Sequence, residues 1–152
     1  MFRPELIGVV ALSRLDFPKF RTIMKYLGID FGLNNLGLSY AEGPLSEPFS
    51  QYHYTSQKKA LEFLKRVIKK EQINTIIIGL PEGRLAEKVK DFGTRLHQQT
   101  NLPVFYQDET LSTKEAKQKM LEAHFPQKKR RQDHRIAAAI ILQSYLDDHY
   151  KS

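Results

Sequence analysis

Short apolar runs and longer amphipathic segments alternate along the chain, and their periods predict strands and helices. Strands are expected where β-branched and other apolar residues cluster in short runs bounded by turn residues. These runs span residues 25–30, 36–41, 49–54, 75–79 and 104–108. Helices are expected where apolar residues recur every three or four positions. These segments span residues 56–71, 85–96, 112–121 and 136–150.

The order of these elements predicts an α/β fold built on one mixed sheet. Three consecutive strands with short connections favour an antiparallel meander, whereas strands separated by helices require right-handed parallel crossovers. The run Thr75–Gly79 shows no polar alternation, so this strand should be covered on both faces. We therefore predict a five-stranded sheet, with three antiparallel strands followed by parallel crossovers and with helices on both faces.

Residues 1–23 show neither helical nor strand periodicity. A secretory signal is not expected, because Glu5 precedes the short apolar run and Arg14 follows it. We predict that residues 1–23 form an extension with little structure of its own and that residues 24–152 form a single domain. The sequence leaves open whether Met1 or Met24 is the true start.

Composition narrows the class of protein. The 152 residues include 24 Lys and Arg against 17 Asp and Glu, a formal net charge of +7 that favours a polyanionic partner. The absence of cysteine excludes disulfides, thiol nucleophiles and cysteine-ligated zinc, and the five histidines lack the spacing of a metal site. The longest apolar runs, Leu6–Leu12 and Ile136–Leu142, are far shorter than the ~18 residues of a membrane span.

Carboxylates occur at the ends of three predicted elements. Asp30 ends the first strand, and Asp108 and Glu109 end the last one, where alternation sends them to opposite faces. Asp133 precedes the last helix, where Asp is a good N-cap. However, the positions 133, 137, 140 and 144 follow helical spacing, which would place Asp133 above the sheet-facing stripe of that helix.

If these three carboxylates converge, their oxygens suit a hard divalent cation. Mg²⁺ and Mn²⁺ are the expected cofactors, because both prefer oxygen ligands. Two such ions can activate a water and stabilise the leaving oxygen during phosphodiester cleavage. Carboxylates crowded without a cation would repel one another, so the cluster is costly as a purely structural feature.

Motifs at these positions resemble those of the YqgF/RuvX family, which is described both as a pre-16S rRNA nuclease and as a Holliday junction resolvase. The resemblance covers residues 24–148. It rests on Gly28-Ile-Asp-Phe-Gly32 with Gly37, Ile78-Gly-Leu-Pro81, Asp108-Glu-Thr-Leu-Ser-Thr113, and Asp133-x-x-Ile-Ala-Ala-Ala139 leading into Leu142-Gln-Ser-Tyr-Leu146. It implies a ribonuclease H-like fold and a bacterial, cytoplasmic, divalent-metal nuclease. The acidic residues of the family map onto Asp30, Glu109 and Asp133.

Several candidate contacts to nucleic acid surround these motifs. The family usually has a basic residue in the first hairpin turn and an arginine after the Asp-Glu pair, whereas this chain has Asn34-Asn35 and Thr110. Arg84 could supply one of the missing phosphate contacts, and the basic run next to Asp133 could position phosphates without reading sequence. The predicted contacts are Asn34, Asn35, Arg84, Lys128, Lys129, Arg130, Arg131 and Arg135. Glu82 and Asp108 remain alternatives to Glu109.

The favoured function is processing of the 5′ end of pre-16S rRNA in ribosome biogenesis. One alternative is resolution of four-way DNA junctions, which needs two coordinated active sites and therefore a homodimer. A second alternative is a non-catalytic RNA-binding assembly factor. A sugar kinase or actin-like ATPase is disfavoured, because those proteins pair two such domains and this chain has room for one.

Overall fold

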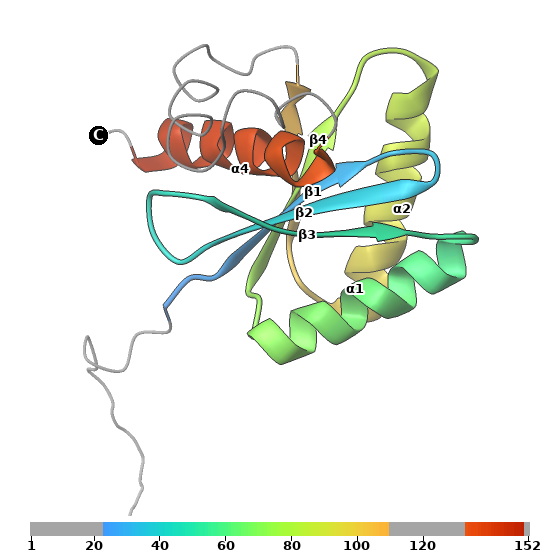
Figure 1. Ribbon diagram of the computed structural model, residues 1–152, viewed down its shortest axis with the longest axis horizontal. Helices are drawn as coiled ribbons and strands as arrows, with labels where there is room; N and C mark the ends of the chain where they lie inside the picture. The colour runs from blue at the N-terminus through green and yellow to red at the C-terminus, as the bar shows by residue number, and fades with distance from the viewer. Residues whose placement is uncertain (1–22, 110–132, 151–152) are drawn as a thin grey trace, which may run out of the picture.

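The structure is a computed structural model and describes residues 23–109 and 133–150. Within those ranges it contains five strands and three helices (Figure 1). The strands are β1 Tyr26–Phe31, β2 Asn35–Ala41, β3 Glu47–His53, β4 Thr75–Leu80 and β5 Val104–Asp108. The helices are α1 Gln57–Glu71, α2 Arg84–Thr100 and α4 His134–Tyr150. The predicted extension before Met24, apart from Ile23, and the predicted helix at 112–121 lie outside the described residues.

The strands form one mixed sheet in the order β3-β2-β1-β4-β5. β1 pairs with β2, and β2 with β3, in antiparallel fashion, whereas β4 lies parallel to both β1 and β5. This arrangement confirms the predicted antiparallel meander followed by parallel crossovers. Because β1, β4 and β5 run in the same direction, their carboxyl ends lie at one end of the sheet, which we call the carboxyl end.

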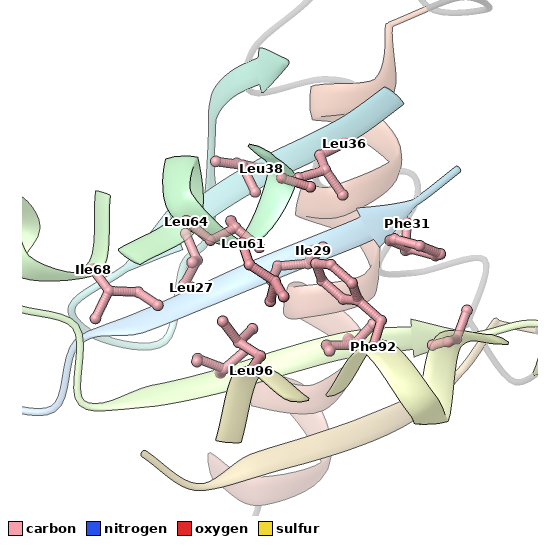
Figure 2. Packing of buried hydrophobic residues seen from close by; sticks show 14 of the residues in the cluster. Leu27, Ile29, Phe31, Leu36, Leu38, Leu61, Leu64, Ile68, Phe92 and Leu96 are labelled. Atoms are coloured by element: carbon pink, nitrogen blue, oxygen red, sulfur yellow. The ribbon is translucent and has the colours of Figure 1, made fainter. Parts of the chain in front are cut away.

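Helices cover both faces of the sheet, as predicted. α1 and α2 cover one face, where side chains from β1, β2 and β4 pack against both helices (Figure 2). α4 crosses the opposite face (Figure 1), where Ile141, Leu142 and Leu146 pack against Ile77 and Ala41. None of the described helices is long and apolar enough to cross a membrane.

α4 lies very close to the sheet because the strands beneath it present glycine and serine. A Cβ at Gly37 would overlap the backbone carbonyl of His134, and one at Gly28 would lie 2.8 Å from the Cβ of Leu142. Ser39 Oγ lies in the same layer and donates a hydrogen bond to the Ala138 carbonyl oxygen at 2.7 Å. These contacts set the position of the amino-terminal turn of α4 above β1 and β2.

Two predictions about the elements are corrected. β3 begins at Glu47 rather than at 49, since an outermost strand tolerates a proline and Pro48 pairs with Ser39. The stripe of α4 that faces the sheet includes Ala138 and Leu142, whereas the predicted Ala137 and Ile140 are only half-buried. Of the predicted stripe that continues Asp133, only Ser144 is buried, and the residues that contact the sheet lie one position later. The polar residues of α4 are spread around the helix instead of gathering on one side, so its sequence contains no polar face that would set the register.

Candidate active site

Asp30 points towards α4 at the carboxyl end of β1. Leu27 and Ile29 alternate with it and pack into the core beneath α1 and α2, which leaves Asp30 on the other face. Its side chain is 21% exposed, and its Oδ2 lies 3.7 Å from Nδ1 of His134. Burial raises the pKa of Asp30 above its usual range, and the neighbouring His134 partly opposes this rise.

Glu109 reaches the same place from the end of β5. A Cβ at Gly79 of β4 would lie 2.7 Å from Oε1 of Glu109, so the Glu109 side chain passes over the α4 face of the sheet where that glycine leaves room. Burial raises the pKa of Glu109, and the negative charges of Asp30 and Asp108 raise it further. Asp30 and Glu109 therefore lie close enough to repel each other when both are ionised.

Asp133 is adjacent in sequence to His134, but its side chain is turned to Arg135. Asp133 Oδ1 accepts hydrogen bonds from the Arg135 backbone N–H at 3.0 Å and from Arg135 Nε at 2.9 Å. Asp133 Oδ2 accepts a third bond from an Arg135 terminal nitrogen at 2.6 Å. These bonds hold the pKa of Asp133 below its usual range. Asp133 thus caps α4, as its position before the helix indicated.

The predicted three-carboxylate cluster is only partly formed. Among residues 23–109 and 133–150, no three acidic or histidine side chains are grouped closely enough to hold a metal ion. Asp30 and Glu109 do come together, and among the described basic side chains only His134 opposes their negative charge. A divalent cation would relieve this repulsion and would bind hard carboxylate oxygens, so the pair fits Mg²⁺ or Mn²⁺.

A sequence model of one family, RuvX, described as Holliday junction resolvase, matches residues 24–148. The chain belongs to the RuvX family. The match begins just before β1 and ends within the last turn of α4, so it includes every described strand, α1, α2 and nearly all of α4.

Curated relatives of this RuvX-family chain carry the name "Putative pre-16S rRNA nuclease". The relative from Lactococcus lactis subsp. cremoris is 33% identical over 136 residues, which cover 82% of this chain and 95% of that protein. The relative from Clostridioides difficile is 34% identical over 132 residues, which cover 81% of this chain and 94% of that protein.

Solved structures with the same architecture confirm the predicted ribonuclease H-like fold. Thermus thermophilus RuvC in complex with a Holliday junction substrate matches with a TM-score of 0.63, covering 83% of this chain and 95% of that one. Fowlpox virus resolvase in complex with Holliday junction DNA matches with a TM-score of 0.58, covering 84% of this chain and all of that one. Both are 15% identical to the RuvX-family chain, so the likeness is one of fold.

The other predicted site residues that the structure describes are exposed or half-buried. Arg84 is exposed at the start of α2, and the turn residue Asn34 is also exposed. Asn35 Oδ1 lies 3.3 Å from Nδ1 of His53 on the neighbouring strand. Glu82 is exposed in the turn after β4, and alternation places Asp108 on the face opposite to Glu109. Lys128, Lys129, Arg130 and Arg131 lie outside the described residues, so their contact with nucleic acid stays a prediction.

Sequence reasoning missed His134. Because the five histidines lack the spacing of metal ligands, His134 was not predicted to be a site residue, although it follows Asp133 directly. In the structure its backbone carbonyl lies over Gly37 and its ring lies beside Asp30. The signal that could have identified His134 is its position in α4. It lies four residues before Ala138 and eight before Leu142, which both contact the sheet at Gly28.

Proposed function

We propose that this RuvX-family chain is a divalent-metal-dependent nuclease that hydrolyses phosphodiester bonds of precursor rRNA. In this proposal it is a cytoplasmic enzyme that acts at the 5′ end of pre-16S rRNA during ribosome biogenesis. The observation that carries the proposal is that Glu109, which follows β5, extends over Gly79 of β4 next to the end of β1, where Asp30 lies. The names of the curated relatives support rRNA as the substrate.

Asp30 and Glu109 are the proposed ligands of Mg²⁺ or Mn²⁺. When bound, these ions lower the pKa of a water and stabilise negative charge on the leaving oxygen. The two carboxylates would hold such a cation at the carboxyl end of the sheet, where part of the Asp30 side chain is exposed. Hydrolysis forms a bond between the water oxygen and phosphorus and breaks the bond to the leaving oxygen, which takes up a proton.

Asp133 is the proposed third carboxylate, and Arg135 controls its availability. The planar guanidinium of Arg135 makes a bidentate pair with Asp133, the same geometry that it can make with a phosphate. A substrate phosphate that takes over Arg135 would release Asp133 towards Asp30 and Glu109. Arg84 and the basic run 128–131 would bind further phosphates and position the strand without reading its sequence.

Cleavage of a precursor rRNA fragment tests this proposal. The wild-type protein should cleave the fragment in Mg²⁺ or Mn²⁺ and not in EDTA. Asp30→Asn keeps the shape of the side chain and removes its charge, so it should abolish cleavage and preserve the fold. Asp108→Asn is the matched control, because Asp108 lies on the other face and its substitution should reduce cleavage less. Full activity of Asp30→Asn would contradict the proposal.

The family description favours a second candidate function, resolution of four-way DNA junctions. This function would use the same carboxylates but would need a homodimer, because two strands must be cut in a coordinated way. Junction DNA incubated in parallel with precursor rRNA separates the two functions. If neither substrate is cut and RNA still binds, the chain is instead a non-catalytic RNA-binding assembly factor.

A further inference from the structure

α1 displays six basic residues that lie in two rows along one side of the helix. The rows are Lys58, Lys65, Lys69 and Lys59, Arg66, Lys70. Within each row the spacing is i, i+7, i+11, which keeps the side chains aligned along the helix axis for about 16 Å. All six residues are exposed. α1 has only two acidic residues, Glu62 and Glu71, so it alone accounts for much of the positive charge of the chain.

Helix stability explains only part of this pattern: Lys69 and Lys70 lie in the last turn, where the helix dipole favours positive charge, but the other four basic residues have no such explanation. Lys58 and Lys59 lie in the first turn, where the helix dipole disfavours positive charge and where α1 has no acidic residue. Lys65 and Lys69 are like charges at i, i+4, a spacing that weakens a helix, and Arg66 and Lys70 repeat it. Among residues 23–109 and 133–150, no ion pair neutralises any of the six cations.

One of the two rows borders a groove between α1 and α2. The groove has a volume of about 300 Å³ and is lined by Lys58, Leu61, Glu62, Lys65, Arg95 and Gln99. Lys65 Nζ donates a hydrogen bond to Gln99 Oε1 at 3.3 Å, and an Arg95 terminal nitrogen donates to Gln57 Oε1 at 3.2 Å. The groove therefore presents mainly N–H donors, with one carboxylate among the side chains that line it.

The basic side of α1 begins at the carboxyl end of the sheet, where Asp30 and Glu109 lie. Tyr54, which precedes α1, donates its backbone N–H to the Asn34 carbonyl oxygen at 2.9 Å and its hydroxyl to the Gly32 carbonyl oxygen. Both acceptors belong to the turn that follows β1. From there α1 runs away from the carboxylates on the face opposite to α4 (Figure 1). A nucleic acid held at the carboxylates would therefore reach α1 by passing around the carboxyl end of the sheet, at the turn that follows β1.

We propose that the two basic rows of α1, with the groove against α2, bind the phosphate backbone of an RNA helix that adjoins the cleaved strand. This inference rests on the proposed function, because it takes precursor rRNA as the substrate. The surface would bind phosphates by charge and hydrogen bonding and would therefore lack base preference. A double helix is favoured over a single strand because the basic face is two rows wide and has no exposed aromatic residue for base stacking.

The test measures binding of the full chain to a fluorescent RNA hairpin in EDTA over a range of salt concentrations. The variant Arg66→Gln with Lys70→Gln removes two cations from the row that does not border the groove. Glutamine is a good helix former, so α1 should remain folded. The control Lys88→Gln with Lys90→Gln removes two exposed cations from α2 outside the groove. We expect the slope of log K against log salt to become shallower by about 1.8 in the variant and to stay unchanged in the control.

Other outcomes overturn the inference. An unchanged slope in the α1 variant would show that these cations do not bind RNA and would leave an acidic protein as the partner to consider. If the α1 variant had a shallower salt dependence than wild type with a DNA hairpin but not with the RNA hairpin, the surface would bind DNA instead. Cleavage of a short single-stranded RNA should keep its kcat in the α1 variant. Because binding is measured without metal, failure of this inference is distinct from failure of the proposed nuclease activity, which would appear as absent cleavage by the wild type.

Discussion

The carboxyl group of Asp30 experiences two opposing influences at the residue scale. Burial beneath α4 favours its neutral form, and the imidazole of His134 favours its charged form, with burial the larger effect. Glu109 lacks such a histidine and is further disfavoured as an anion by Asp30 itself. Without a cation, both carboxyl groups therefore bind protons more tightly in the folded state than in the unfolded state.

This linkage predicts how the metal-free protein responds to pH. Where a carboxyl pKa is raised by folding, its contribution to stability is full below the ordinary pKa of about 4 and is lost as pH rises through the folded-state pKa. Asp30→Asn removes this loss, so the variant should melt at a higher temperature than wild type at pH 7 in EDTA. The difference should shrink as pH falls towards 4. A variant that melts lower than wild type at pH 7 would contradict the assigned electrostatics.

Asp133 should behave in the opposite way, because Arg135 lowers its pKa. Its contribution to stability is present above the ordinary carboxyl pKa and is lost as pH falls through the folded-state value. Asp133→Asn keeps the helix cap, since Asn caps about as well as Asp, and it weakens the pair with Arg135. We expect a small loss of stability at pH 7, measured by urea unfolding, together with loss of cleavage. Full cleavage activity would leave Asp133 with a capping role alone.

At the scale of elements, the glycines of the sheet determine where α4 lies. Gly37 is covered by the backbone of His134, so an added methyl group meets an atom that cannot rotate away. Gly37→Ala should therefore destabilise the protein by about 1–3 kcal/mol in denaturant unfolding and should also reduce cleavage, because the first turn of α4 must shift. Gly43→Ala is the matched control, since no atom lies within 4 Å of its added Cβ. Equal stability of the two variants would contradict this packing.

The helices and strands also show which parts of the fold can be predicted from the sequence. Strand periodicity and turn residues located all five strands of the described residues, and apolar spacing located α1, which Ser56 caps by accepting a hydrogen bond from the Lys59 backbone N–H. The register of α4 could not be predicted, because its polar residues are spread around the helix and mark no single solvent-facing side. Its register depends instead on the glycines and serines of strands far away in the sequence.

The unpredictable register of α4 also determines which features of the candidate site could be predicted. Asp30 and Glu109 were predictable, because strand ends and alternation determine the face on which each carboxylate lies. The turn of Asp133 towards Arg135 and the approach of His134 to Asp30 were not, since both follow from the register of α4. Strand alternation was therefore enough to predict the faces of the sheet carboxylates, whereas the direction of the Asp133 side chain depends on α4.

At the scale of the whole molecule, Lys25 is the first residue of the described range 23–109 for which a backbone hydrogen bond to the fold is seen. The Lys25 backbone N–H donates to Asn74 Oδ1 at 2.8 Å, and its carbonyl oxygen accepts from the backbone of Asn74 and Thr75. A chain that starts at Met24 should therefore unfold at the same temperature as the full chain, with equal cooperativity, in a calorimetric scan. A large drop in the melting temperature would show that residues before Met24 contribute to the core.

The central claim is that Asp30 and Glu109 together hold a divalent cation, and calorimetric titration with Mn²⁺ tests it most directly. The wild-type protein should bind Mn²⁺, and both Asp30→Asn and Glu109→Gln should lose that binding while remaining folded. Asp108→Asn should retain binding, because its carboxylate lies on the other face of the sheet. Mn²⁺ affinity unchanged from wild type in Asp30→Asn would contradict the claim.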